Sequence, residues 1–195
     1  MDRREALKRT AWIMGGAISA PALIGIMKGC KAKPTLEGWK PAFLSDDQGL
    51  LISQVSEIII PKTDTPGAKE AGVPGFIDQM LKEVYKKEDQ DKFLNGLKAF
   101  SDEAAKKYGD PFTELDAAKQ LEFVTEKHDA AVKEQKETKP APERPFILNM
   151  KELTMLGFFT SQPGATQVLQ YEPVPGAYKG CLPLSEAGNG KTWAT

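Results

Sequence analysis

Histidine and cysteine, the residues that most often bind metals or act as nucleophile and base, are scarce in this chain. It holds one histidine, His128, and two cysteines, Cys30 and Cys181. A zinc or haem-iron site normally needs several such ligands, and covalent haem attachment needs a CxxCH motif, which the sequence lacks. No nucleophile signature surrounds Cys181, and His128 lies far from it along the chain. We therefore expect no metal ligand, bound cofactor or catalytic residue in this chain.

The glycine-rich segments do not predict a phosphate or nucleotide site. GNGKTW near the end of the chain contains GKT, but it lacks the earlier glycine of a phosphate-binding loop. No GxGxxG follows a predicted strand, which excludes the dinucleotide-binding motif. These glycines are typical of turns.

The first thirty residues have the pattern of an export signal. Arg3 and Arg4 precede an uncharged run from Ala11 to Met27 that is rich in Gly and Ala. The segment RREALK resembles the twin-arginine export signal. The alternative, an uncleaved membrane helix, needs about 17 to 25 strongly apolar residues, and this run reaches only the lower limit. We expect residues 1–30 to be an export signal and the protein to be periplasmic.

The signal ends in IMKGCK, where Cys30 directly follows a glycine. This resembles a bacterial lipoprotein cleavage site, although Lys28 stands where a small residue is usual. Cleavage there would make Cys30 the lipid-bearing first residue and would anchor the protein to the membrane. In the alternative, Cys30 is only part of the signal. Residues 31–42 carry Pro, Gly and Lys without an apolar period and are expected to be a linker.

The composition of the remaining chain excludes several classes of function. Removing the five basic and two acidic residues of 1–30 leaves a net charge of minus four, which does not favour nucleic-acid binding. The length suits one domain, expected over residues 43–195. Since Cys181 is the only cysteine beyond Cys30, no internal disulfide framework can form.

Apolar residues recur at helical spacing and predict a single all-α domain of about five or six helices. Ser45 and Gln48 form a capping box before a helix that ends by Pro61. Pro74 opens a second helix, and a third starts near Gln90 and stops at Gly109. The expected buried faces are Leu51, Val55, Ile58 and Ile59, then Phe76, Ile77, Met80, Leu81 and Val84, then Phe93, Leu97, Phe100 and Ala104.

The second half of the domain is expected to add further helices and an irregular tail. A fourth helix begins with Thr113 and Asp116 and gives way to the exposed linker KEQKETKPAPERP. Its expected buried residues are Leu115, Ala118 and Leu121, with Val124 and His128 as further candidates. A fifth helix after Pro145 buries Ile147, Met150, Leu153 or Thr154, and Phe158. Ser161 caps a short helix, GATQVLQY, and the remaining tail should lie against the helices.

Two long segments carry a resemblance to a known family, IIIPKTDTPGAKEAGVPGFID and LTMLGFFTSQPGATQVLQYEPVPGAYKGC. They resemble the small subunit of bacterial gluconate 2-dehydrogenase, the subunit 3 family, over about residues 46–183. In that family the small subunit accompanies a large, FAD-bearing subunit of the glucose-methanol-choline oxidoreductase class, and a cytochrome c subunit often takes the electrons onward. The resemblance implies an accessory subunit, itself not a catalyst, that assists maturation, export and assembly of the flavoprotein.

The resemblance also points to residues that would contact the partner. In the first motif they are Pro61, Thr63, Pro66 and Gly67. In the second they are Gly157, Phe158, Phe159, Ser161, Gly164, Tyr171, Pro175, Gly176, Tyr178, Gly180 and Cys181. Proline and glycine can equally fix turns, and Phe and Tyr can equally fill a core. Cys181 is in addition a candidate for a disulfide to the partner.

Two other functions fit the same residues. One is a periplasmic lipoprotein that acts alone and binds a small ligand or a cell-envelope partner between its helices. The other is an enzyme that uses Cys181, whose activity in the isolated chain would be abolished by alkylation.

Overall fold

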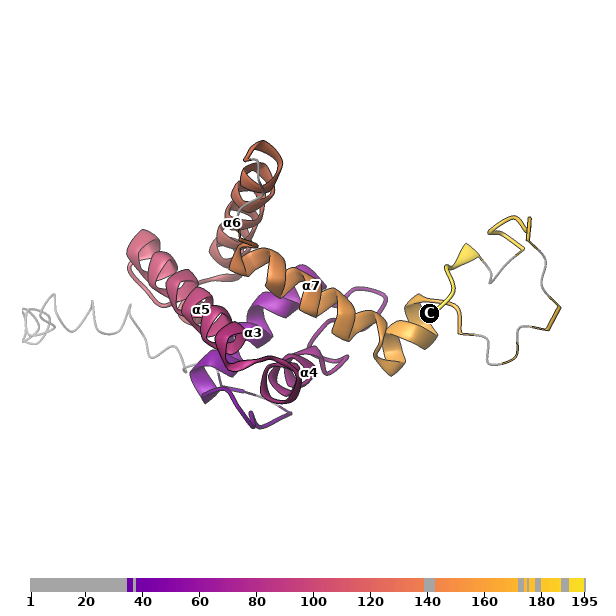
Figure 1. Cartoon of the computed structure of the whole chain (residues 1–195), viewed down its shortest axis with the longest axis horizontal. Helices are drawn as coiled ribbons and strands as arrows, with labels where there is room; N and C mark the ends of the chain where they lie inside the picture. The colour runs from indigo at the N-terminus through magenta and orange to yellow at the C-terminus, as the bar shows by residue number, and fades with distance from the viewer. Residues whose placement is uncertain are drawn as a thin grey trace, which may run out of the picture. The chain divides into compact units, whose positions relative to one another are not determined.

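The computed structural model describes residues 35–36, 38–138, 143–171, 174, 176–177, 180–186 and 190–194. The chain divides into two units, and only the second, Pro34–Thr195, contains described residues. The predicted export signal and Cys30 lie outside them. In the described part the α-helices are α3 (Asp46–Ile59), α4 (Val73–Gln79), α5 (Lys87–Tyr108), α6 (Ala117–Glu137) and α7 (Phe146–Phe159). Two π-helical turns, η1 (Met80–Val84) and η3 (Gly164–Val168), and a 3-10 turn, η2 (Phe112–Glu114), complete the set. The predicted all-α domain is confirmed (Figure 1).

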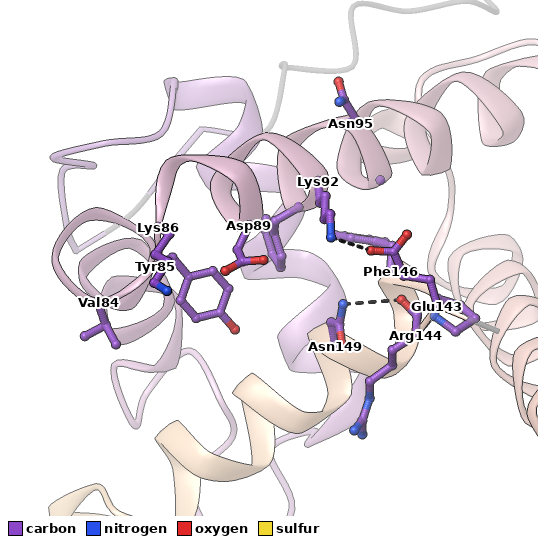
Figure 2. A pocket seen from close by; sticks show the side chains of 13 residues that line it. Val84, Tyr85, Lys86, Asp89, Lys92, Asn95, Glu143, Arg144, Phe146 and Asn149 are labelled. Carbon is purple, nitrogen blue, oxygen red and sulfur yellow. Dashed lines mark hydrogen bonds and ion pairs between the residues drawn. The ribbon is translucent and has the colours of Figure 1, made fainter. Parts of the chain in front are cut away.

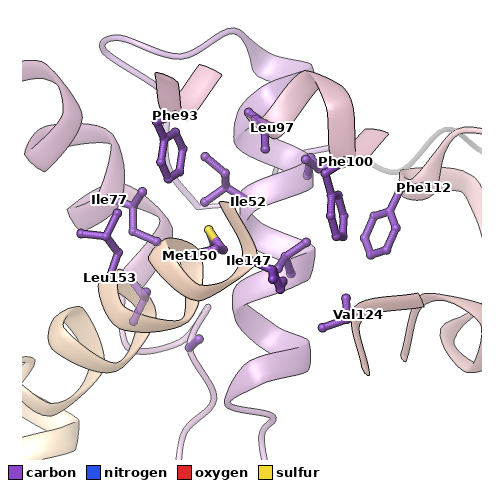
Figure 3. Packing of buried hydrophobic residues seen from close by; sticks show 14 of the residues in the cluster. Ile52, Ile77, Phe93, Leu97, Phe100, Phe112, Val124, Ile147, Met150 and Leu153 are labelled. Carbon is purple, nitrogen blue, oxygen red and sulfur yellow. The ribbon is translucent and has the colours of Figure 1, made fainter. Parts of the chain in front are cut away.

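Helix α7 is the centre of the packing and contacts α3, α4, α5 and α6. Its buried face carries Ile147, Met150 and Leu153, as the helical spacing predicts. Figure 3 shows these side chains among those of Ile52 from α3 and Ile77 from α4. Burying an apolar side chain of this size stabilises the fold by about 1.5 to 3 kcal/mol.

Aromatic contacts join the longer helices on the other side of the core. The ring of Phe100 in α5 lies 5.2 Å from that of Phe112 and 4.9 Å from that of Phe123 in α6. It also lies 5.7 Å from the ring of Phe146 at the start of α7. These tilted and edge-to-face pairs are the arrangements that aromatic quadrupoles favour.

The predicted capping box of α3 is confirmed. The Ser45 hydroxyl accepts a hydrogen bond from the Gln48 backbone N–H at 3.3 Å, and the Gln48 side chain accepts one from the Ser45 N–H at 2.9 Å. The pair satisfies two N–H groups that helix geometry leaves without a partner.

The chain ahead of α3 is held by a carboxylate from α4, which we call the Asp78 clamp. The Asp78 oxygens accept hydrogen bonds from the backbone N–H groups of Ala42 at 2.7 Å, Phe43 at 3.2 Å and Leu44 at 2.8 Å. Asp78 is only 2% exposed. Because a buried carboxylate is costly without partners, these three donors both satisfy it and fix the approach to α3.

The prediction that Val84 lies on the buried face of the second helix is wrong, because this side chain is 63% exposed. The reason is the π-turn η1, in which the Tyr85 N–H bonds the carbonyl of Met80, five residues earlier, at 3.1 Å. A turn of this kind takes in one more residue than an α-turn, so the side chains that follow rotate away from the buried stripe.

The start and the buried face of α6 also differ from the prediction. Thr113 lies in η2, and α6 begins at Ala117 after the cap residue Asp116. Ala118 and Leu121 are exposed, and the buried residues are Phe123, Val124 and Ala131. The expected burial of Leu115 and Val124 is confirmed, whereas that of Ala118 and Leu121 is wrong.

Helix α6 also runs further than predicted. It ends at Glu137 and so includes the first five residues of the segment expected to be a linker. The local reason is composition, because Lys, Glu and Gln are good helix formers even where no apolar residue recurs.

Asp116 caps α6 and supports a prediction of pH dependence. Its carboxylate accepts a hydrogen bond from the Lys119 N–H at 3.0 Å, and this bond, together with the Lys119 side chain, lowers the pKa of Asp116. A carboxyl group whose pKa is lower in the folded state stabilises the fold fully above its unfolded pKa. That contribution is lost as the pH falls through the folded pKa. We expect Asp116→Ala to lower the thermal unfolding midpoint at neutral pH, and the difference from wild type to vanish in acid.

The measurement is a series of thermal melts at decreasing pH, with Asp110→Ala as the control. The Asp110 side chain is also an exposed carboxyl group, but it does not cap a helix. A difference that stayed constant down to acidic pH would contradict the role of the ionised cap.

The tail after η3 differs from the prediction that it lies against the helices. The short helix ends at Val168, and Tyr171, Val174 and Leu184 are 60%, 77% and 52% exposed. The tail is instead closed at its base, where the Gln170 N–H bonds the carbonyl of Thr192 and the Ala194 N–H bonds that of Gln170, both at 2.7 Å. None of the helices in the described ranges has the length and apolar character that a bilayer crossing requires.

Candidate functional site

The first motif forms a loop that is folded around one side chain of α3, which we call the Glu57 clamp. The Glu57 carboxylate accepts hydrogen bonds from the backbone N–H groups of Lys62 at 3.1 Å and Lys69 at 2.9 Å. The loop then returns to α3, since the Ala68 N–H bonds the carbonyl of Ile60 at 2.9 Å. Two ends of one loop are thus held by one carboxylate.

Of the four predicted contact residues in this loop, two face solvent. Pro61 and Thr63 are exposed, Pro66 is half-buried and Gly67 is buried. A Cβ atom on Gly67 would lie 2.3 Å from Glu57 Oε1 and 2.7 Å from the backbone nitrogen of Lys62. Gly67 therefore has a structural role, because no side chain fits beside the clamp.

Gly67→Ala is accordingly expected to displace the Glu57 carboxylate and open the loop. We expect a loss of about 1 to 2 kcal/mol in the free energy of unfolding. Amide exchange at Lys62 and Lys69 should accelerate, which hydrogen-exchange mass spectrometry of the loop peptides would measure. In the double variant with Glu57→Ala, most of the cost of Gly67→Ala should disappear, and additive losses would contradict the proposed clash.

The second motif covers the last turns of α7 and the turn η3. A Cβ atom on Gly157 would lie 2.6 Å from Cδ1 of Phe76, so this glycine lets α4 and α7 approach closely. Phe158 is only 2% exposed and belongs to the core, and Phe159 is half-buried with its ring edge-to-face with that of Phe158 at 5.4 Å. These residues hold the fold together.

Ser161 caps the following turn, as predicted. Its hydroxyl accepts a hydrogen bond from the Gly164 N–H at 3.1 Å and donates one to the carbonyl of Phe158 at 2.6 Å. Gly164 is buried directly against that carbonyl. Both residues thus serve the reversal of the chain after α7.

The tail contains further predicted contact residues that are exposed. Tyr171 is 60% exposed, Gly176 and Gly180 face solvent, and Cys181 is a free, exposed thiol. Pro175 and Tyr178 lie outside the described residues. Within the described chain, no hydrogen bond joins the first motif to the second. The structure therefore divides the predicted set into residues that build the fold and residues that remain available for a partner.

The described residues show no group of three or more His, Cys, Asp or Glu side chains placed to hold a metal ion. His128 is half-buried on α6, where Nδ1 lies 3.1 Å from Asp129 and Nε2 lies 3.0 Å from Nζ of Lys151 on α7. The ring is therefore positioned by one polar neighbour at each of its nitrogens.

A pocket of about 790 Å³ opens between the first turns of α5 and α7 (Figure 2). Its charges largely compensate one another. Lys92 Nζ lies 2.8 Å from Glu143 Oε1, and Arg144 Nη1 lies 3.0 Å from Glu152 Oε2. Because the ammonium of Lys92 and the guanidinium of Arg144 are already paired, these two cations offer little attraction to a charged ligand.

Tyr85 at one side of this pocket is not suited to act as a base. Burial first, and then the charges of Glu152 and Asp89, raise the pKa of the phenol above its ordinary value. The group stays protonated at neutral pH and can only support a hydrogen bond.

The sequence patterns missed Glu57, Asp78 and Lys151, which organise these surfaces. Glu57 and Asp78 bind backbone N–H groups, and no spacing rule marks a carboxylate for that purpose. Lys151 and His128 meet across α6 and α7, which required the tertiary structure.

The comparison with protein families finds one match, the family described as Gluconate 2-dehydrogenase subunit 3, over residues 46–176. The matched range runs from the first residue of α3 through η3 and into the tail. No curated protein and no solved structure matches the chain.

Proposed function

The chain belongs to the gluconate 2-dehydrogenase subunit 3 family, and from this premise we propose that it is the non-catalytic small subunit of an exported, FAD-dependent sugar or sugar-acid dehydrogenase. The observation that carries the proposal is the extent of the match, which includes every helix of the described domain. The catalytic partner would be a flavoprotein large subunit of the glucose-methanol-choline type, with FAD bound in that chain. A cytochrome c subunit would accept the electrons.

The exposed tail supports a role in binding another protein. It carries several exposed apolar side chains in one irregular segment, and exposed apolar surface often marks a contact with another protein. The exposed fractions are 60% for Tyr171, 77% for Val174, 39% for Leu182, 52% for Leu184 and 45% for Trp193. A free thiol at Cys181 in the same segment would allow a disulfide to the partner, which a non-reducing gel of the purified complex would reveal.

Copurification tests the assembly of the complex. The tagged full chain is expressed with a glucose-methanol-choline-type flavoprotein from the same organism, and the eluate is examined for bound FAD by its absorption and fluorescence. We expect the flavoprotein to copurify. A chain that brings down no flavoprotein, or that oxidises a sugar acid alone, would overturn the proposal.

Export is tested separately through the signal. We propose that Arg3 and Arg4 direct both subunits across the membrane, so the double variant Arg3→Lys/Arg4→Lys should leave the flavoprotein in the cytoplasm. Arg9→Lys, a neighbouring basic residue outside the pair, is the control. Normal export of the flavoprotein with the double variant would exclude the escort role. Mass spectrometry of the mature N-terminus would determine whether Cys30 carries a lipid.

A further inference from the structure

Helix α7 carries an apolar stripe beside its buried face that is only partly covered. Leu148, Met155, Leu156 and Phe159 recur at helical spacing, with Lys151 between them. Leu148 and Phe159 are partly buried against the core, whereas Met155 and Leu156 are 42% and 45% exposed. Among the described residues, the cover over this part of α7 is therefore incomplete.

This stripe forms one wall of a groove that continues onto α3 and α6, and we call it the α7 groove. One part has a volume of about 580 Å³ and lies between α6, α7 and η3, lined by Leu148, Met155 and Phe159 among others. The adjoining part, about 180 Å³, is lined by Ile58, Ile59 and Leu121. Both parts have His128 and Lys151 in their lining, so they adjoin at this pair.

The charged side chains of the groove indicate which kind of partner group it would bind. Arg144 at one end is neutralised by Glu152, 3.0 Å away. Lys151 in the middle has His128 as its hydrogen-bond partner, and no carboxylate lies within ion-pair distance among the described residues. An ammonium group that has no carboxylate partner and is bordered on one side by Ile58, Ile59 and Leu121 attracts an incoming carboxylate.

We propose that the α7 groove is the docking site for an amphipathic helix of the flavoprotein large subunit, which places a carboxylate on Lys151 between apolar side chains. The inference rests on the proposed function and goes beyond the two motif loops. An apolar face with anchors at helical spacing is the surface that a helix of a partner recognises.

The test compares groove variants with matched surface variants in the full chain, coexpressed with the large subunit. Leu156→Glu and Lys151→Glu are expected to reduce the copurified flavoprotein at least about tenfold, the effect of losing one interface anchor. Val84→Glu and Lys106→Glu, at exposed positions outside the groove, should leave it unchanged. Lys151→Arg should retain binding because it keeps the charge. Thermal melts of the purified variants establish that each is folded.

The outcomes separate this inference from the proposed function. If wild type and groove variants copurify the flavoprotein equally, the groove proposal is overturned and the accessory role stands. If the wild-type chain copurifies no flavoprotein, both the groove proposal and the proposed function are overturned. A stable dimer of the isolated chain that Leu156→Glu dissociates would show that a second copy covers the groove. If copurification of the flavoprotein is lost only when residues 172–195 are deleted, the tail is the contact surface instead. This result, like the dimer, would overturn the groove proposal.

Discussion

Asp78→Ala is expected to lower the free energy of unfolding by about 3 to 5 kcal/mol, because three backbone N–H groups lose a charged acceptor at once. The clamp joins the segment before α3 to α4, and the Leu44 N–H is buried, so water cannot replace the lost partner there. A loss of this size is a large fraction of the stability of a domain this long. Urea unfolding at neutral pH, followed by circular dichroism, measures it.

Two variants show whether the clamp is the cause. Asp78→Asn keeps one acceptor oxygen and nearly the same shape, and it should lose less than alanine does. Asp110→Asn, at an exposed position, should change stability by no more than about 0.5 kcal/mol. Equal, small losses for Asp78→Ala and Asp110→Asn would refute the role of Asp78. Hydrogen exchange should also show that the amides of residues 42–44 lose protection first.

Gly164→Ala is the second substitution with a large expected effect. The new Cβ atom would lie 1.9 Å from the carbonyl oxygen of Phe158 and 2.8 Å from its carbon. That carbonyl cannot move easily, since it accepts hydrogen bonds from both the N–H and the hydroxyl of Ser161. We expect a loss of about 3 kcal/mol and the unwinding of η3, because the backbone itself must shift.

The matched control is Gly75→Ala in α4. There the nearest atom to the added Cβ would be a ring carbon of Trp39 at 3.8 Å, which is an ordinary contact. Alanine should be neutral or stabilise slightly at that position, since it restricts the unfolded chain. Thermal melts of both variants, with amide exchange at Ala165 and Leu169, provide the comparison. An intact η3 in the Gly164 variant would contradict the close contact.

Apolar periodicity and capping residues were sufficient to predict most of the helices. The capping box at Ser45, the stop at Gly109 and the face of α7 all depend on residues within a few positions of one another. Such local signals do not require knowledge of the fold. Gly109 has φ +83°, a conformation that glycine adopts without strain.

The errors arose where the tertiary structure decides between local alternatives. Leu121 is as apolar as Val124, and only the packing of α6 on α3 and α7 determines that the first is exposed. The π-turn before Val84 leaves no pattern in the sequence. Asp78 resembles any surface carboxylate until Ala42 and Leu44 are placed beside it.

The motif residues show how far a family resemblance can locate a site. Gly67, Gly157 and Gly164 stand where a side chain would collide with a neighbour, so their presence in the motifs reflects folding. Tyr171 and Cys181 have no such role in the described structure and remain candidates for the partner.

The paired base of the tail has a spectroscopic consequence. The described chain contains two tryptophans: Trp39, which lies against α3 and α4 at Gly49 and Gly75, and Trp193, which is 45% exposed in the bridge to Gln170. The Trp39 indole therefore emits from a largely apolar environment, whereas the Trp193 indole emits from one that is partly exposed to water. In a protein expressed from residue 31 onward, which lacks Trp12, Trp193→Phe leaves a fluorophore that follows unfolding of the helices. Trp39→Phe leaves one that shifts to the blue when another molecule covers the tail.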